Sequence, residues 1–595
     1  MRWKTCHRVT AVCVAAGIVF TIFSLELVHL QIGKHEEYSR LAAEKHAIKQ
    51  PIYAKRGLIR DRNGEILAAN LPIRKVILDG SHVNNADALA RLAAPYLGIP
   101  EDELRQKFQT GKKYVVIERE LDEEKAYALR REMADASLRG LYFLESSRRV
   151  YPNGRMLAHV LGFLSRKDPQ DDHVVGVEGI ERTLEEELRG EDGFRHIERD
   201  RTGSEIVVYR GQEQPPRQGE TAELTIDMGL QSIVEEELDT AWAELKPNTA
   251  VAIMVEPHSG EILAMATRPN FDPNNLVAAK VEEMKNRAIM DVIEPGSTFK
   301  IVVTSAALTE RVVNDKTQIY CENGRFAYGG KILRDHHGYG QMGVSDIIIK
   351  SSNIGCAKLA LKLGEDRFYS YVRSFGFGER TGVALPGEVP GILSPPSRWD
   401  KLTITRIPMG QAIAVTPLQI TMAMATIANG GQLMKPLIVR RLRDDQGRDV
   451  AVIAPEVVRR VIPTDTAHFL NAALTGVTGL GGTARLAAVP GYSVAGKTGT
   501  AQKVSPKGGY ADGKYVASFV GYLPAENPAF VCLVMVDDAK VPSNLNYGGL
   551  VAAPVFERIG TRAARYLNLV PTLQAESVLP LAKGGPPEGR KEARR

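Results

Sequence analysis

Cysteine is scarce in this 595-residue sequence, and the five cysteines include no C-x-x-C pair. Cys6 and Cys13 lie near the N-terminus, which leaves Cys321, Cys356 and Cys532 for the rest of the chain. Such a small, odd number of cysteines argues against a disulfide framework and against a structural zinc site. One disulfide bridge is compatible with the sequence, and none is required.

A charge excess of one sign and an internal repeat are also missing. The chain has 76 basic and 71 acidic residues, and a net charge of +5 is too even to indicate nucleic-acid binding over the whole chain. Hydrophobic residues at 44% and charged residues at 25% describe a globular protein rather than a disordered, collagenous or many-span membrane protein. The chain is too long for one ordinary domain, so two or more folded units are expected.

A long apolar run stands at the N-terminus. Residues 9–25 carry no charged side chain, and a run of this length is short for a membrane span. The apolar character continues to Ile32. Arg2, Lys4 and Arg8 precede the run, so the positive-inside tendency predicts a cytoplasmic N-terminus and an extracytoplasmic position for the rest. A cleaved signal peptide is the alternative. We favour a retained single-pass anchor, because the run is longer than a usual signal core and no small-x-small site follows it.

The rest of the chain divides at a polar, proline-bearing stretch, residues 212–219. Before it, strand-like runs mix with charged helical patterns such as residues 122–133. After it come a helical pattern over 228–245 and an apolar strand over 250–255, so both parts are predicted to be α+β. The expected order is a cytoplasmic tail (1–8), a transmembrane anchor (9–32), an elongated α+β pedestal (33–218) that begins with a helical stalk to about residue 50, a larger helix-rich domain (219–570) and a disordered tail (571–595).

A serine and a lysine three residues apart are the first candidates for chemistry. In the stretch E-P-G-S-T-F-K, Pro295 suits a first helical turn, and the apolar run 301–308 predicts a buried helix behind it. Ser297 and Lys300 would share one face, and the helix start would offer Ser297 free N–H groups for a developing anion. A serine hydroxyl needs a base, and a lysine with a lowered pKa can supply it. Alone, this pattern is also typical of a capped helix start.

A second candidate, Ser351-Ser352-Asn353, follows the apolar residues 347–349. As an S-x-N pattern it provides a hydroxyl at Ser351 that can pass a proton and an amide at Asn353 that can donate to a peptide carbonyl. In isolation the same residues would be an ordinary helix cap.

The third candidate is Lys497-Thr498-Gly499-Thr500. In an extended strand the two threonines point the same way, and the glycine between them leaves room for another backbone. A strand edge with hydroxyls and a lysine suits a peptide that ends in a carboxylate. By itself the K-T-G pattern is weak.

The three patterns become specific in combination. They occur in the order S-x-x-K, S-x-N and K-T-G, with Ser351 54 positions after Ser297 and Lys497 146 positions after Ser351. This order is the arrangement found in penicillin-binding proteins and serine β-lactamases. The combination therefore predicts a serine acyltransferase.

The resemblance to class B penicillin-binding proteins extends beyond these motifs and covers about residues 9–567. The stretches that resemble family signatures are R-G-L-I-R-D-R-N-G at 56–64, R-V-Y-P at 149–152, G-V-E-G-I-E at 176–181, and a C-terminal segment, 547–556, that is similar to the division-type members. The resemblance implies an antiparallel sheet flanked by helices in the larger domain. It implies neither a metal nor another cofactor.

What the resemblance implies chemically is a two-step acyl transfer on peptidoglycan stem peptides that end in D-Ala-D-Ala. Ser297 would attack the penultimate carbonyl with Lys300 as base, and D-Ala would leave with a proton delivered through Ser351. The amino group of a neighbouring stem would then resolve the acyl-enzyme. A β-lactam would acylate Ser297 and stay bound.

The resemblance also implies roles for the remaining motif residues. Asn353 would hold the donor peptide, and Lys497 would keep the electrostatic potential positive. Thr498 and Thr500, on either side of Gly499, would bind the terminal carboxylate. The backbone N–H groups of Ser297 and Thr500 would form the oxyanion hole, in which each donor is typically worth roughly a hundredfold in rate.

Two patterns of related enzymes are missing. No E-x-x-x-N lies between Asn353 and Lys497, so the deacylating glutamate of class A β-lactamases has no candidate and rapid β-lactam hydrolysis is not expected. The E-D-x-x-F-x-x-H-x-G pattern of the glycosyltransferase domain in bifunctional relatives is also absent. By family analogy, glycan polymerisation would come from a SEDS-type partner.

Several alternatives stay open at this point. A β-lactam sensor on the same fold would want more membrane spans and a cytoplasmic signalling part, and a non-catalytic divisome scaffold would be expected to lack one of the motifs. A carboxypeptidase would differ only in using water as the acceptor. Within class B, we favour a septal role in cell division over a role in elongation, because the 547–556 segment resembles the division type.

Overall fold

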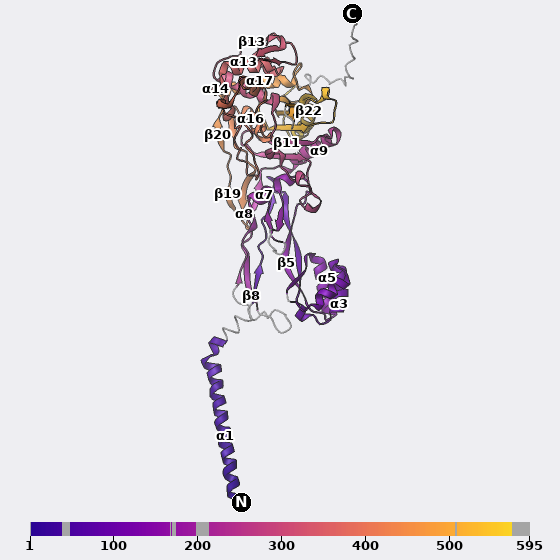
Figure 1. Ribbon diagram of the computed structural model, residues 1–595, viewed down its shortest axis with the longest axis vertical. Helices are drawn as coiled ribbons and strands as arrows, with labels where there is room; N and C mark the ends of the chain where they lie inside the picture. Colours follow the sequence, from indigo (N-terminus) through magenta and orange to yellow (C-terminus); the bar gives the residue numbers. More distant parts are fainter. Residues whose placement is uncertain are drawn as a thin grey trace. The chain divides into compact units, whose positions relative to one another are not determined.

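The computed structural model describes residues 2–38, 48–112, 114–166, 168, 174–197, 213–505 and 509–573 (Figure 1). The chain forms two compact units, and neither is one continuous stretch of sequence. Unit 1 comprises Met1–Arg56, Asn70–Arg148 and Gly190–Gly219, and unit 2 comprises Gly57–Ala69, Arg149–Arg189 and Glu220–Arg595. Beyond residue 573, the tail that we expected to be disordered lies outside the described residues.

The N-terminal segment is helical. Helix α1 runs over Arg2–Val28, and one π-helical turn, His29–Gly33, follows it. The stretch His7–Gly33 has a mean hydropathy of 2.3 and none of it is buried, so its length and composition allow it to cross a membrane. The predicted helical stalk is wrong at its end, because Ile48–Ile52 forms strand β1. Pro51 disfavours a helix but is tolerated in β1, an edge strand of the sheet β1-β8-β9.

Unit 1 contains antiparallel strands and a small helical core. Its helices are α3 (Ala86–Leu97), α4 (Glu101–Gln109) and α5 (Glu123–Asp135), the last of which confirms the helical pattern over 122–133. Strand β3 (Ile66–Leu78) pairs in this unit with β4 (Val115–Asp122) and with β5 (Leu141–Val150), while β1 pairs with β8 (Gly193–Ile197) and β8 with β9 (Glu213–Gln214). Apolar side chains at helical spacing, such as Leu89, Leu104 and Leu129, are fully buried in the core of this unit.

All but the first residue of the R-G-L-I-R-D-R-N-G stretch lies in unit 2, where the stretch forms a turn against helix α9 (Met228–Leu245). The buried carboxylate of Asp61 accepts hydrogen bonds from the backbone N–H groups of Asn63, Glu65 and Met228. The carboxylate of Asp61 therefore satisfies an N–H group at the start of α9, which has no partner within the helix. A buried ion pair in the same unit joins Arg149 to Glu181 at 2.7 Å.

The centre of unit 2 is a five-stranded antiparallel sheet in the order β12-β11-β23-β22-β21. Its strands are β11 (Thr249–Val255), β12 (Ile262–Arg268), β21 (Ala495–Val504), β22 (Tyr510–Leu523) and β23 (Phe530–Asp537). Helices α9 and α19 (Ala553–Tyr566) pack together on the sheet, and the buried helix α16 (Pro417–Ala428) packs on β11, β22 and β23. The patterns over 228–245 and 250–255 are confirmed as a helix and a strand, and β21 is left at one edge of the sheet.

The other elements of unit 2 lie outside this sheet. The strands are β2 (Ile59–Arg60), β6 (Leu164–Arg166), β7 (Val174–Gly176), β10 (Thr221–Leu224), β13 (Gln318–Tyr320), β14 (Arg325–Tyr328), β15 (Lys331–Arg334), β16 (Gln341–Gly343), β17 (Gln432–Met434), β18 (Val439–Arg443), β19 (Asp449–Val452) and β20 (Val457–Arg460). The α-helices, together with the 3-10 turn η6 (Gly296–Phe299), are α6 (Ala158–Leu161), α7 (Gly179–Thr183), α8 (Glu185–Arg189), α10 (Arg287–Met290), α11 (Lys300–Thr309), α12 (Val344–Ile349), α13 (Asn353–Leu363), α14 (Glu365–Ser374), α15 (Thr403–Arg406), α17 (Thr464–Thr478) and α18 (Gly548–Val551).

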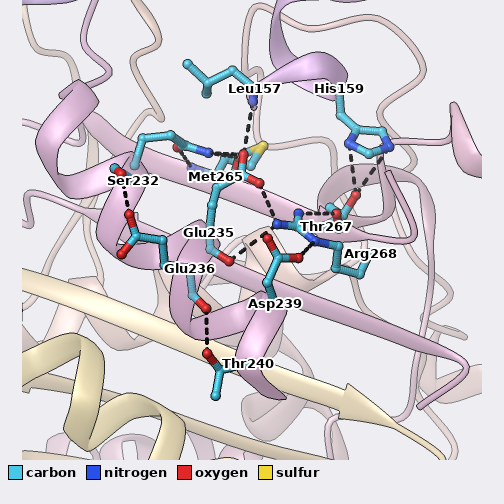
Figure 2. Close-up of polar contacts among 11 residues, drawn as sticks. Leu157, His159, Ser232, Glu235, Glu236, Asp239, Thr240, Met265, Thr267 and Arg268 are labelled. Atoms are coloured by element: carbon cyan, nitrogen blue, oxygen red, sulfur yellow. Dashed lines mark hydrogen bonds and ion pairs between the residues drawn. The ribbon is translucent and has the colours of Figure 1, made fainter. Parts of the chain in front are cut away.

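A buried polar cluster ties the segment around residue 157 to α9 and β12 (Figure 2). Arg268 at the end of β12 donates to Glu235 at 2.7 Å and to Asp239 at 2.5 Å, both on α9. Glu235 also accepts from the backbone N–H of Leu157. His159 is buried nearby, where its Nε2 lies 2.7 Å from the carbonyl oxygen of Glu283.

We expect this cluster to be sensitive to loss of its buried carboxylate. The Glu235 side chain is 7% exposed and that of Asp239 is 62% exposed. Glu235→Ala should lower the free energy of unfolding by about 3–5 kcal/mol, because it leaves a buried guanidinium without its buried partner. The matched change Asp239→Ala should cost about 1 kcal/mol or less. Chemical denaturation of the detergent-solubilised chain measures both, and equal losses would contradict this account.

His159 predicts a dependence of stability on pH. Burial lowers the pKa of His159 from 6.5 to about 4. In the unfolded chain the imidazole binds a proton as the pH falls through 6.5, whereas in the folded chain it stays neutral down to about 4. Stability from this group is therefore present above pH 6.5 and lost on acidification, with a slope of up to about 1.4 kcal/mol per pH unit. His159→Gln, which keeps a donor for Glu283, should flatten the unfolding free energy between these pH values, and an unchanged slope would contradict this.

Candidate active site

The turn that carries Ser297 precedes a buried helix. Pro295 leads into the 3-10 turn η6, which contains Ser297, and Lys300 is the first residue of α11. Ser297 is partly exposed, whereas Lys300 is fully buried. The apolar residues of α11 enter the core, so the sequence pattern places the serine at the surface of unit 2 and the lysine beneath it.

The S-x-N residues lie between α12 and α13. Ser352 is the N-cap of α13, and its hydroxyl accepts from the N–H of Gly355 at 2.9 Å. Ser351, one residue earlier, has a φ of 59°, a left-handed conformation that non-glycine residues rarely adopt. The helix-cap interpretation is thus correct for Ser352, while Ser351 is held in a sparsely populated conformation.

The K-T-G residues lie on the edge strand β21. Thr498 and Thr500 occupy alternate positions of this strand, opposite Phe519 and Ala517 of β22. A Cβ atom at Gly499 would lie 3.0 Å from the carbonyl oxygen of Pro295 and 2.3 Å from Ser518 Oγ. Glycine at this position therefore allows the serine-bearing turn to approach the strand, as the sequence pattern predicts.

Lys300 brings the first two motifs together. Its Nζ donates to Ser351 Oγ at 3.0 Å, to the Ser351 carbonyl oxygen at 2.5 Å and to Asn353 Oδ1 at 2.8 Å. All three hydrogens of a protonated amine are used in this arrangement. No hydrogen bond between Lys300 and the Ser297 hydroxyl is present among the described residues, so Lys300 must release a proton before it can accept one from Ser297.

Lys497 brings in the third motif at the same hydroxyl. Its Nζ donates to Ser351 Oγ at 3.1 Å, and it also lies 3.3 Å from the carbonyl oxygen and the hydroxyl of Thr498. Ser351 Oγ thus accepts from both lysines. A hydroxyl oxygen has two lone pairs, so its own hydrogen is left to point away from both amines.

Burial lowers the pKa values of both lysines. The pKa of Lys300 falls from 10.5 to about 8, chiefly through burial, against the opposing influence of Cys356 and Asp335. The pKa of Lys497 is lowered well below 10.5, again chiefly through burial and then through the charge of Lys300. Two buried amines that share one hydroxyl repel each other when both are protonated, so the pair favours a single positive charge.

Asp335, just after β15, was not found from the sequence. Its carboxylate accepts from Ser352 Oγ at 2.6 Å and from the backbone N–H groups of Asn353 and Ile354 at 2.5 and 3.1 Å. It therefore fixes the start of α13 and, with it, the strained Ser351. The preceding carbonyl, of Arg334, accepts from Asn353 Nδ2 at 3.0 Å. An aspartate in a loop has no spacing signal that relates it to a motif 16 residues later.

Two further contacts at β21 were also missed. The Thr483 hydroxyl lies 3.1 Å from the Thr498 hydroxyl, and the N–H of Gly548 donates to Thr500 Oγ1 at 3.1 Å. Thr483 lies in a glycine-containing loop and Gly548 is the first residue of α18, and neither position shows a periodic pattern. They place a third threonine hydroxyl beside the K-T-G residues.

The three cysteines of unit 2 are thiols. Cys321, Cys356 and Cys532 are free and buried. Burial raises the pKa of Cys321 and raises those of Cys356 and Cys532 to about 12. The thiolate is the reactive form of cysteine, so none of these three is a candidate nucleophile.

Comparisons with known proteins agree with these motifs. Residues 250–560 match the penicillin binding protein transpeptidase domain, and residues 51–224 match the penicillin-binding protein dimerisation domain. Stage V sporulation protein D of Bacillus subtilis is 34% identical over 93% of this chain and 84% of its own length. Peptidoglycan D,D-transpeptidase FtsI of Escherichia coli is 32% identical over 88% of this chain and 85% of its own. The crystal structure of penicillin binding protein 3 from Mycobacterium tuberculosis complexed with aztreonam is 27% identical, with a TM-score of 0.67 over 88% of this chain and 98% of that one.

The contacts of Asp335 give a prediction for the site. Asp335→Asn keeps the size of the side chain but replaces one of its acceptor oxygens by a donor, so the S-x-N turn should shift. Displacement of a catalytic group by about 1 Å costs about 100-fold, so labelling by a fluorescent penicillin should slow by about 10- to 100-fold. Asp346→Asn, an exposed change on α12, is the control and should leave labelling unaltered. Equal labelling of the two variants would contradict the assignment.

Proposed function

Because the chain belongs to the class B penicillin-binding proteins, we propose that it is the serine D,D-transpeptidase that cross-links peptidoglycan stem peptides at the division septum. The observation that carries this proposal is the convergence of Lys300 and Lys497 on the Ser351 hydroxyl, beside the turn that bears Ser297. A scaffold without activity would have no need for two buried amines, whose burial is costly.

In the first step Ser297 attacks the carbonyl carbon of the penultimate D-Ala. Lys300 in its neutral form takes the hydroxyl proton, and the Oγ–C bond forms as the peptide C–N bond breaks. The Ser351 hydroxyl, which accepts from both lysines, passes a proton to the departing nitrogen of the terminal D-Ala. The lysine pair keeps one positive charge at the site, and Lys497 carries it while Lys300 is neutral.

We propose the edge strand β21 as the binding site of the donor peptide. Its open side can pair with an extended peptide, and the hydroxyls of Thr498 and Thr500 are placed to bind the terminal carboxylate. Asn353 would donate from its amide to the donor backbone. The N–H groups of Ser297 and Thr500 would form the oxyanion hole, which is supported by the closeness of the two segments: a Cβ atom at Gly296 would lie 3.0–3.2 Å from the backbone of Thr500.

We propose a single-pass anchor in the cytoplasmic membrane, with residues 1–8 inside and the catalytic domain outside. We retain residues 33–218 as the pedestal and 219–570 as the transpeptidase domain, and a SEDS-type glycan polymerase and divisome proteins as partners. The septal role rests on the resemblance of residues 547–556 to division-type members. An elongation role is the alternative.

The catalytic proposal is tested by covalent labelling. The full chain in detergent should form a stable adduct with a fluorescent penicillin, and Ser297→Ala should form none, as read by denaturing gel and intact mass. With uncross-linked peptidoglycan strands, only the wild type should produce cross-linked dimers. A labelled Ser297→Ala protein would move the nucleophile elsewhere, and rapid release of hydrolysed drug would indicate a β-lactamase.

The lowered pKa of Lys300 predicts the pH profile of acylation. A base must be unprotonated, and a pKa of about 8 leaves about one lysine in ten neutral at pH 7. The second-order rate constant for penicillin acylation should therefore rise about tenfold per pH unit below 8 and level off above it. A rate constant that stays flat between pH 6 and 8 would contradict Lys300 as the base.

The septal role is tested in the producing cells. Depletion of the protein should give filaments that lack septa, and a fluorescent fusion should gather at midcell. Rounded cells with normal septa would instead support the elongation role.

A further inference from the structure

Glu294 lies three residues before Ser297, just ahead of the 3-10 turn η6. Its Oε1 accepts from the backbone N–H of Ala412 at 2.9 Å, and the Tyr510 hydroxyl donates to Oε2 at 3.1 Å. Tyr510 is the first residue of β22. The carboxylate therefore joins the segment before the serine turn to two other parts of unit 2, the loop around residue 412 and the start of β22.

The packing of glycines places these parts close to the reacting serine. A Cβ atom at Gly410 would lie 2.2–2.7 Å from the backbone of Gly296, and one at Gly296 would lie 3.0–3.2 Å from the backbone of Thr500. The loop that holds Glu294 therefore rests directly on the residue before Ser297. A group bound at Glu294 would therefore be held next to the segment that carries Ser297.

Glu294 has no basic partner among the described residues, although it is half-buried. Its hydrogen bonds come from neutral groups, and burial raises its pKa. Arg406 acts electrostatically on Tyr510 but forms no ion pair with Glu294. Asp291, three residues earlier, contrasts with it, because Asp291 pairs with Lys285 at 2.5 Å and with Arg287 at 3.1 Å. A half-buried carboxylate without a cation at a reaction centre suits a cationic ligand.

The second step of the reaction, in which the acyl-enzyme is attacked by an amine, involves such a cation. The proposed transpeptidase needs an amine from a neighbouring stem peptide, and at neutral pH a free alkyl amine is protonated and unreactive. On the basis of that proposed function, we propose that Glu294 is the acceptor site: it binds the acceptor ammonium beside Ser297 and takes the proton that makes it a nucleophile.

The atoms and protons of this step balance. The acceptor ammonium gives one proton to Glu294, and the neutral nitrogen attacks the acyl carbon. A C–N bond forms, the bond from the acyl carbon to Ser297 Oγ breaks, and the second N–H proton passes through Lys300 to Oγ. Glu294 then releases its proton to water, and the products are the amide and the free serine.

The test compares two nucleophiles on one acyl-enzyme. The full chain in detergent is acylated by an N-acyl-D-Ala-D-lactate ester, and the aminolysis and hydrolysis products are quantified with glycinamide, which is largely protonated at pH 7, or with hydroxylamine, which is largely neutral. General-base catalysis is typically worth about 10²–10⁴-fold, so Glu294→Gln should lower glycinamide aminolysis at least about tenfold relative to its own acylation rate. Hydroxylamine aminolysis should change by no more than about twofold.

Controls separate this inference from the proposed function. Asp291→Asn, which removes a carboxylate that is already paired, should leave the ratio of glycinamide to hydroxylamine products unchanged. Glu294→Asp keeps the charge and should retain part of the preference for glycinamide. Equal losses with the two nucleophiles, or no loss, would overturn the acceptor assignment. Loss of penicillin labelling in Glu294→Gln would also overturn it, since the carboxylate would then position the serine turn. A wild-type chain without penicillin labelling would instead refute the proposed function.

Discussion

The shared hydrogen bonding of Lys300 and Lys497 to one serine hydroxyl is the interaction on which the rest of the site depends. Neither amine is exposed to water, and each has a lowered pKa because of burial. The two lysines come from motifs 197 positions apart, one on α11 and one on β21. Only a fold that brings the start of a buried helix against the edge of a sheet can place them together.

Several costly features of unit 2 follow from that requirement. Ser351 adopts a left-handed conformation, and the Asp335 carboxylate and the Ser352 cap hold the turn in which it lies. A Cβ atom at Gly499 would meet Ser518 Oγ at 2.3 Å and the Pro295 carbonyl oxygen at 3.0 Å, so glycine is needed there. Such strain is tolerated where the surrounding structure fixes it, and here the fixed geometry keeps a proton donor between two amines.

The helices and strands with a clear apolar periodicity were predictable from the sequence, and those without one were not. The patterns over 228–245 and 250–255 correspond to α9 and β11, because apolar spacing reports a buried face directly. The stalk was wrong at Ile48–Ile52, since pairing with β8 decides that structure and short strands carry little local signal. The division at residues 212–219 also did not anticipate that residues 57–69 and 149–189 belong to the same compact unit as the sheet.

The same distinction applies to the site. The catalytic candidates were found because three known spacings occur in order, and the structure brings Lys300, Ser351, Asn353 and Lys497 into hydrogen-bonding contact. Asp335 and Thr483 contribute through tertiary contacts from loops, so no sequence pattern singled them out. Their positions depend on which loops the fold places around Ser297, which is long-range information. Glu294 stands in the E-P-G-S-T-F-K stretch itself, but its contacts with Ala412 and Tyr510 are visible only in the fold.

The most direct test of the account is a measurement of how many protons the two buried lysines hold. NMR titration of the chain labelled with 13Cε-lysine, with Lys300→Met and Lys497→Met to assign the signals, reports the protonation of each amine. The account predicts that the pair carries one positive charge near neutral pH, with both pKa values below the ordinary lysine range. If both lysines instead remain protonated up to pH 10, the central claim is contradicted, because no neutral amine would be present to activate Ser297.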